Sequence, residues 1–260
     1  MDAPPLNQKE RIAAEAISLR YGATTVLDKV TLRVRCGEIV AVLGRSGSGK
    51  TSLLRSLALF AQPQSGSIRL DGQEVLSNGQ VVVDPLLLRR RVCMVFQHYS
   101  LFPNLTGLEN ITFAHRRRFQ ISKPVSEAAA RKLASVFGLN DDVLKRYPES
   151  FSGGQAQRIA LLRALILEPE VLLLDEVTSA LDPESIVTVM DAIRKLRATT
   201  ASRGLSVILV THLTSFAAEL ADRMVFMEGG AIVEDCAPRQ FSQSAHPGVR
   251  AFMTRFSQTI

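Results

Sequence analysis

The sequence has few cysteines, and none of them forms a paired motif. Cys36, Cys93 and Cys236 are the three cysteines among 260 residues, and no two of them have the CxxC spacing. A disulfide framework or a cysteine-bound metal needs more thiols at closer spacing. The three residues therefore fit reduced thiols in a cytosolic protein.

Long apolar segments are also missing. No apolar run approaches the roughly 18 residues that a membrane-spanning helix requires, and the opening MDAPPLNQKE lacks the apolar core of a secretory signal. If the protein works at a membrane, we expect another protein to hold it there.

The chain is basic overall but lacks a concentrated basic region. Its formal net charge is +6, yet the tightest basic runs, Arg89–Arg91 and Arg116–Arg118, hold three residues each. Nucleic-acid surfaces need clustered charge, so we expect a solvated basic surface and no nucleic-acid partner. Apolar residues make up 46% of the chain, which excludes general disorder and favours one domain with lobes.

The first part of the chain predicts strands. Residues 11–34 alternate loosely, with turn signals at Gly22 and Asp28, and indicate an antiparallel region. The apolar run 38–43 indicates a buried parallel strand. A glycine-rich turn then leads into a helix near Lys50. The segment 68–75 is typical of a hairpin turned at Asp71–Gly72, and 91–96 of a further strand.

The second part changes character after residue 97. Strand signals fade over residues 98–165, where 126–138 is typical of a helix ended by glycine. This region is a candidate helical lobe inserted into an α/β body. Buried strands are predicted at 171–175 and 206–211, with a helix at about 183–197 between them. That order gives parallel, right-handed βαβ units.

A phosphate-binding loop follows the strand at 38–43. Gly44 to Thr51 has the pattern G-x4-G-K-[ST], after a strand and opening a helix. Glycines let backbone N–H groups wrap phosphates, Lys50 reaches the β- and γ-phosphates, and the Thr51 hydroxyl binds Mg²⁺. The other residues expected to contact the nucleotide are Arg45, Ser46, Gly47, Ser48, Gly49 and Ser52.

A second candidate site lies after the strand at 171–175. Four apolar residues lead into Asp175 and Glu176, and a buried strand delivers such acids to the sheet edge where α/β ligands bind. Asp175 fits Mg²⁺ binding. Glu176 fits a general base that polarises the attacking water.

The segment Phe151-Ser-Gly-Gly-Gln-Ala-Gln-Arg158 resembles the signature motif of ABC ATPases, usually written LSGGQ. The resemblance runs from about Ile12 to the end of the chain. It implies an ABC ATPase fold, which is an α/β P-loop NTPase core with an antiparallel β subdomain and an inserted helical lobe. The expected division is a discontinuous core of 1–97 and 166–240, a lobe of 98–165 and a short tail of 241–260.

The resemblance also assigns residues that mean little alone. Tyr21 matches the aromatic that stacks on adenine and Val26 a neighbour of the same base, although an unaided interpretation of Tyr21 favours a core aromatic. Gln97 matches the glutamine that links Mg²⁺ to the helical lobe. Asp182, in Ser179–Asp182, matches the loop that crosses a dimer interface. His212 matches the histidine that contacts the γ-phosphate.

Family members pair head to tail, so the resemblance implies a homodimer that sandwiches two ATP molecules. Ser152 of one copy supplies a hydroxyl to the γ-phosphate bound by the other, and glycines allow close backbone approach at a helix start. The residues involved are Ser152, Gly153, Gly154 and Gln155. Dimer closure is then the power stroke.

Two positions depart from the family pattern. Phe151 replaces the usual leucine, and both side chains are apolar. Val177 stands where proline is common, and it leaves the backbone beside Glu176 freer than proline does. The second departure bears on the efficiency of hydrolysis rather than its existence.

The segments 89–106, 221–234 and 246–252 are similar to the polar amino acid uptake subfamily. The resemblance implies an importer subunit at the cytoplasmic face of the plasma membrane, with permease subunits as partners and a solute-binding protein as an indirect partner. Transport of another small solute is the alternative. Three other classes fit the sequence less well. A repair ATPase needs a long coiled coil between Gln97 and the signature motif, which lie too close together here. A translation ATPase usually has two cassettes rather than one, and a non-hydrolysing cassette would lack Glu176 or His212, both of which are present.

A permease-docking surface is expected just after Gln97. Residues 98–108 contain five apolar side chains, part of which we expect to lie exposed in a groove between the lobes. Ordinary lobe core is the alternative. The five residues are Tyr99, Leu101, Phe102, Leu105 and Leu108.

Overall fold

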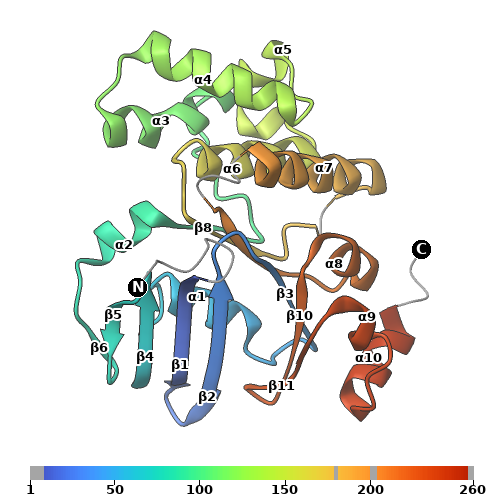
Figure 1. Ribbon diagram of the computed structural model, residues 1–260. Coiled ribbons are helices and arrows are strands. Elements are labelled where there is room, and N and C mark those ends of the chain that lie inside the picture. The colour runs from blue at the N-terminus through green and yellow to red at the C-terminus, as the bar shows by residue number, and fades with distance from the viewer. Residues whose placement is uncertain (1–8, 179–180, 200–203, 257–260) are drawn as a thin grey trace.

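The computed structural model describes residues 9–178, 181–199 and 204–256 (Figure 1). These residues form two sheets with a group of helices above them. The 5-stranded sheet has the order β2-β1-β4-β5-β6, and the 6-stranded sheet the order β11-β10-β3-β9-β8-β7. The mixed α/β architecture predicted from the sequence is confirmed. The expected division at residues 97 and 165 stays a prediction.

Five strands of the 6-stranded sheet are parallel. They are β3 (Ile39–Gly44), β7 (Val92–Val95), β8 (Val171–Asp175), β9 (Ser206–Val210) and β10 (Arg223–Glu228), and antiparallel β11 (Ala231–Cys236) closes one edge. Every residue of β3, β8 and β9 is buried, as continuous apolar runs require when both faces of a sheet are covered. The predicted strands among these are confirmed; β10 and β11 were not predicted.

The second sheet is antiparallel where its strands pair. Its strands are β1 (Glu10–Tyr21), β2 (Thr24–Arg35), β4 (Ser65–Leu70), β5 (Gln73–Ser77) and β6 (Gln80–Val81). The turns at Gly22 and at Asp71–Gly72 are confirmed. The turn expected at Asp28 is wrong. Asp28 lies inside β2, beside an irregularity at Lys29, and its N–H donates to the Gly230 carbonyl at 2.9 Å.

The helices begin and end at identifiable signals. Thr106 and Glu109 form a capping box at the start of α3, and Gly138 (φ 64°) follows the end of α4, which begins three residues before the predicted start at 126. No helix in the described part of the chain is long and apolar enough to cross a bilayer. The helices are α1 (Lys50–Leu57), α2 (Pro85–Arg91), α3 (Gly107–Phe119), α4 (Lys123–Val136), α5 (Asp141–Leu144), α6 (Gly153–Leu165), α7 (Pro183–Thr199), α8 (Thr214–Leu220), α9 (Pro238–Phe241) and α10 (Pro247–Phe256), with a 3₁₀ turn at Pro148–Ser150.

Strand β3 separates two apolar cores. Ile39, Ala41 and Leu43 face a core shared with the helices of the lobe, whereas Val40 and Val42 face a core shared with α1 and the antiparallel sheet. Alternate side chains of a strand point to opposite faces, so one strand can support both cores. The phosphate loop therefore leaves a strand that is buried on both faces.

Helix α9, just before the expected tail of 241–260, and helix α10 within it pack onto β10. The rings of Phe241 and Phe252 lie 6.2 Å and 5.3 Å from the ring of Phe226, and Val249 is fully buried. Apolar residues at helical spacing over residues 238–252 therefore extend the core beyond the strands.

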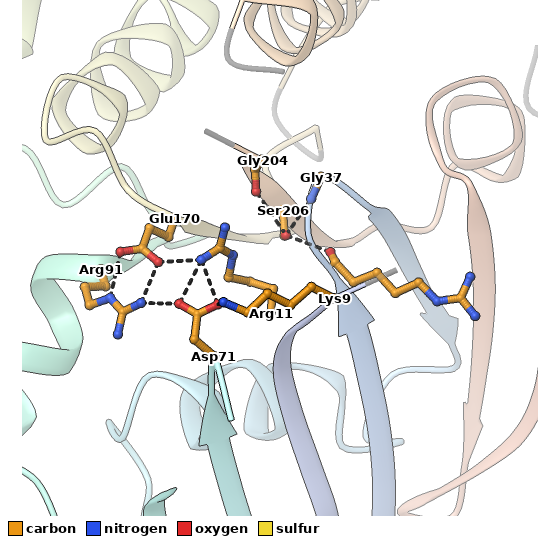
Figure 2. A network of polar contacts seen from close by, with 9 residues as sticks. Lys9, Arg11, Gly37, Asp71, Arg91, Glu170, Gly204 and Ser206 are labelled. Carbon is orange, nitrogen blue, oxygen red and sulfur yellow. Dashed lines mark hydrogen bonds and ion pairs between the residues drawn. The ribbon is translucent and has the colours of Figure 1, made fainter. Parts of the chain in front are cut away.

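A cluster of ion pairs joins the antiparallel sheet to the 6-stranded sheet at the edge where β7 and β8 begin (Figure 2). Arg11 Nη1 lies 2.8 Å from Asp71 Oδ2 and 2.6 Å from Glu170 Oε2. Arg91 contacts the same two carboxylates. Burial alone raises the pKa of Asp71, but Arg11, Lys9 and Arg91 hold that pKa below its usual value.

Replacing Asp71 with Asn should destabilise the fold, because it leaves two partly buried arginines with one carboxylate between them. We expect a loss of about 1–3 kcal/mol at pH 7, measured by urea denaturation. Since the folded-state pKa of Asp71 is depressed, its contribution is present above about pH 4 and is lost as pH falls through the folded-state pKa. The difference in the free energy of unfolding between Asp71→Asn and the unaltered protein should therefore disappear over that pH range.

Glu219→Gln is the control, because Glu219 is 66% exposed in a surface pair with Arg194 and surface pairs contribute little. Equal effects of the two substitutions at pH 7 would show that the cluster does not fasten the sheets together.

Candidate functional site

Four predicted site segments lie at one edge of the 6-stranded sheet. Because β3, β7, β8 and β9 are parallel, their carboxyl ends meet at the same edge, which is where ligands bind in α/β proteins. The segments that leave this edge carry the phosphate loop, Gln97, Asp175–Glu176 and His212.

The loop between β3 and α1 needs glycine for two reasons. Gly44 and Gly49 have φ values of 149° and 101°, which favour glycine. A Cβ at Gly44 would lie 2.3 Å from the Met227 carbonyl oxygen, and one at Gly49 would lie 2.7 Å from the Val26 carbonyl oxygen. A Cβ at Gly47 would meet nothing within 4 Å. The loop is therefore packed at both ends and open in its middle.

Lys50 points into this loop. Its Nζ donates to the carbonyl oxygens of Gly44, at 2.8 Å, and Arg45, at 3.0 Å, and the residue is only 5% exposed. Burial lowers the pKa of Lys50, against opposing contributions from Glu176 and Asp175. Ser48 Oγ is also buried, and no described residue hydrogen-bonds to it. A buried cation and a free hydroxyl in a concave glycine loop fit a phosphate group.

Thr51 and Asp175 form an oxygen donor pair. Thr51 Oγ1 donates to Asp175 Oδ1 at 2.9 Å, and Asp175 is 4% exposed. Burial raises the pKa of Asp175, and the hydrogen bond from Thr51 opposes that rise. One hydroxyl and one carboxylate, without sulfur or imidazole, fit the preference of Mg²⁺ for oxygen ligands shared with phosphates.

Glu176 and His212 form the second pair at this edge. His212 Nε2 lies 2.7 Å from Glu176 Oε1. Glu176 has a left-handed backbone (φ 50°), and its N–H donates to the Val210 carbonyl at 3.0 Å. Such a conformation is costly for a non-glycine residue and is found where the surroundings enforce it, often at active sites. The turn directs the carboxylate toward the imidazole.

The antiparallel sheet borders the phosphate loop. Tyr21, at the end of β1, is 52% exposed, so the alternative interpretation of Tyr21 as a core aromatic is wrong. Val26 is half-buried, and its carbonyl lies where a side chain at Gly49 would have to fit. Gln97 is exposed, two residues after β7.

The signature residues lie at the start of α6 in the helical region. Ser152 caps α6, since its Oγ accepts the Gln155 N–H at 3.2 Å while Gln155 Oε1 accepts the Ser152 N–H at 3.1 Å. Capping uses the hydroxyl oxygen as an acceptor and leaves the hydroxyl proton available to donate. Gly153 follows Ser152 as the first residue of the helix.

Asp182 lies next to the signature helix of its own chain. Its carboxylate accepts from the Ser185 N–H at 2.8 Å and the Ser185 hydroxyl at 2.9 Å. A Cβ at Gly154 would lie 2.6 Å from Ser185 Oγ. Two residues of the predicted interface loop, 179 and 180, lie outside the described residues.

Polar contacts therefore join Thr51 to Asp175 and Glu176 to His212, with Lys50 within electrostatic reach of both acids. They do not bring the signature residues to this group. Thr178 and Thr211 were not predicted as part of the site; their hydroxyls lie 3.2 Å apart, although the residues are 33 positions apart in the chain. No local pattern marks them.

A second missed group lies near the edge. Arg89 Nη2 donates to the Leu59 carbonyl at 2.6 Å, at the end of α1, and its guanidinium lies 4.3 Å from the Phe60 ring centre. The Phe60 ring lies 5.6 Å from that of Phe96. Arg89 therefore helps to hold the start of the Gln97 segment against α1.

Comparison with known proteins agrees with this geometry. The family model described as ABC transporter matches residues 27–179. The chain belongs to the ABC transporter family, and it is an ATP-binding cassette with ATPase activity. The fold and enzyme class predicted from the sequence are confirmed.

Relatives at about 40% identity include two amino acid transport proteins. The arginine transport ATP-binding protein of Bacillus subtilis is 40% identical over 235 residues, covering 90% of this chain and 94% of the relative. The L-cystine transport system ATP-binding protein of Escherichia coli is 41% identical over 243 residues, covering 91% and 94%.

Solved structures show the same fold. The dimeric structure of MJ0796, a bacterial ABC transporter cassette, has a TM-score of 0.78 and 27% identity, covering 88% of this chain and 99% of that chain. A post-hydrolysis dimer of the same cassette, bound to ADP and Pi, also has a TM-score of 0.78, at 26% identity.

Proposed function

We propose that this chain is the ATP-hydrolysing motor subunit of an importer for polar amino acids. The substrate class is supported by relatives named for arginine and L-cystine transport. The chemistry is supported by one observation above all. The Glu176–His212 pair and the Thr51–Asp175 pair lie at the same sheet edge as buried Lys50.

Binding starts at the phosphate loop. The loop N–H groups and Lys50 hold the β- and γ-phosphates, with Lys50 exchanging its bonds to loop carbonyls for bonds to phosphate oxygens. Exposed Tyr21 stacks on adenine, and Val26 packs beside it. The remaining residues in contact with the nucleotide are Gly44, Arg45, Ser46, Gly47, Ser48, Gly49, Thr51 and Ser52.

Thr51 and Asp175 hold Mg²⁺, with Gln97 joining them from the segment after β7. When bound, Mg²⁺ neutralises charge on the phosphates. Glu176 accepts a proton from the water that attacks the γ-phosphorus, and the γ-phosphate bond to ADP breaks. His212 orients Glu176 through Nε2 and contacts the γ-phosphate.

Glu176→Gln keeps the shape of the side chain but removes the base. ATP hydrolysis by the purified chain should fall by at least about a hundredfold. Binding of a fluorescent ATP analogue should persist, since the phosphate loop is untouched.

Glu219→Gln serves again as the control, because Glu219 lies exposed on α8 and its ion pair is with Arg194. Near-normal turnover by Glu176→Gln, at unchanged protein purity, would contradict the assignment of the base.

Each site is completed by a second copy of the chain. Ser152, with an available hydroxyl proton, together with Gly153, Gly154 and Gln155, belongs to a different region from Lys50 and Glu176. Head-to-tail pairing brings these residues to the γ-phosphate of the other copy, with Asp182 at the interface. The dimeric cassette structures support this arrangement.

Shared sites predict complementation between two inactive variants. Lys50→Ala breaks the phosphate loop and Gly153→Asp breaks the signature motif, so each homodimer has no intact site. A mixed dimer collects both changes in one site and leaves the other intact. After equal mixing and free exchange, roughly a quarter of the wild-type sites should return.

Hydrolysis should then rise above the average of the two variants, provided that one intact site suffices. Mixed dimers are verified by a tag pull-down. If hydrolysis does not rise, the ATP occupancy of the mixed dimers distinguishes two explanations. Mixed dimers that bind no ATP tightly would refute sharing, whereas occupied but inactive dimers would mean that both sites must be intact.

The membrane partner is a permease, with a solute-binding protein acting through it, and the chain works at the cytoplasmic face of the membrane. The surface expected to dock the permease is smaller than the sequence suggested. Tyr99 and Leu101 pack against the core and Leu108 is 7% exposed, which favours the lobe-core alternative for them. Phe102 is 44% exposed and lies 5.5 Å from Phe113, which is 41% exposed.

Photo-crosslinking residues at Ser100 and Asn104, which flank Phe102 and are exposed, should capture the permease in membranes. Asn78, exposed in the turn between β5 and β6, is the control position and should not. Capture at neither flanking position, with assembled complex present, would place the dock elsewhere.

A further inference from the structure

Two buried hydroxyls lie behind the Glu176–His212 pair. Thr178 and Thr211 are 5% and 1% exposed, and their Oγ1 atoms lie 3.2 Å apart. The family resemblance, the phosphate loop and the signature motif assign nothing to either residue. Since hydroxyls are costly to bury unpaired, this pairing bonds the two chain segments that leave β8 and β9.

The hydroxyl of Thr211 also shapes the backbone around His212. Its Oγ1 accepts the Leu213 N–H at 3.1 Å, which closes a short turn with His212 as the central residue. The orientation of the imidazole therefore depends on where Thr211 is held. Through its hydroxyl, Thr211 is held by Thr178.

Thr178 has the corresponding position in the other segment. It lies two residues after Glu176, whose N–H donates to the Val210 carbonyl at 3.0 Å. Two bonds thus join the segment that carries Glu176 to the segment that leads into His212, one at Glu176 itself and one two residues later. The bond between Glu176 and Val210 fixes the start of the turn, and the bond between the threonines fixes its end.

Beyond the Glu176–Val210 bond, the local backbone does not favour this turn. Glu176 has a left-handed conformation (φ 50°), which costs free energy. Val177 follows it without the fixed φ that a proline ring imposes. Val177 is 3% exposed and packs in the core, so packing and the threonine pair together hold the turn.

We propose that Thr178 and Thr211 are positioning residues, whose hydroxyl pair sets the placement of the Glu176 carboxylate against the His212 imidazole during ATP hydrolysis. This rests on the proposed function, in which Glu176 is the base. The pair is buried and acts through the two segments that carry Glu176 and His212. It acts on the turnover step and leaves the phosphate loop untouched.

Thr178→Val tests the pair, because valine keeps the branched shape and removes the hydroxyl. The kcat for ATP should fall about tenfold or more, as expected for a misplaced base. Affinity for a fluorescent ATP analogue should stay within about twofold, since Lys50 and the loop are unchanged. Thr178→Ser keeps the hydroxyl and loses only a methyl group, so it should retain most of the kcat.

A second background separates positioning from general loosening. In His212→Ala, no imidazole remains against which the pair can place the Glu176 carboxylate, and adding Thr178→Val should lower the residual turnover by less than about twofold. If Thr178→Val fails to fold, Thr211→Ser and Thr211→Val repeat the comparison from the other side of the pair. Melting temperatures are recorded for every variant.

Three results would overturn the proposal. The first is a kcat for Thr178→Val within twofold of that of the unaltered chain, and the second is a loss of kcat in Thr178→Ser as large as in Thr178→Val. The third is that Thr178→Val lowers turnover as much in the His212→Ala background as in the unaltered chain. Failure of the proposed function gives a different result. In that case Glu176→Gln itself hydrolyses ATP normally. If Glu176→Gln is inactive while Thr178→Val has a normal kcat, only the positioning role of the threonine pair is refuted, and the proposed function stands.

Discussion

Parallel pairing of β3, β9 and β8 is the constraint on which the rest of the structure depends. Residues Ile39–Val42 pair with 207–210, and 171–175 pair with 206–210, so all three strands end at one edge. Their complete burial fixes this register, because a shift of one residue would turn every side chain to the opposite core. The phosphate loop, the two acids and His212 therefore meet although they lie far apart in the sequence.

The antiparallel sheet and the helical region are both fastened to this frame. At one end, Asp71 joins Arg11, Arg91 and Glu170 where β7 and β8 begin. At the other end, the Val26 carbonyl lies against Gly49. The start of α6 packs against Ser185 through Gly154. A change at the start of α7 can thus reach the signature helix of the same chain, which gives the two regions a direct physical link.

Local patterns determined much of the fold and of the candidate site. The continuous apolar runs predicted β3, β8 and β9, because strands buried on both faces need no alternation. The G-x4-G-K-T spacing predicted a loop that the structure explains by two glycines with no room for a Cβ. Asp175 and Glu176 were predictable because their position after a buried strand is itself a local feature. The resemblance added His212, Gln97 and Tyr21, which carry no signal alone.

Only the tertiary structure decided the rest, because those features depend on contacts between distant residues. Asp28 lies within β2, because strand pairing and a bond to Gly230 outweigh its turn preference. Arg89 and Arg91 look alike in sequence, yet one caps α1 and the other joins an ion cluster. Thr178 and Thr211 become a pair only when β8 and β9 align. Sequence determines which chemistry is available, and long-range packing determines which groups meet.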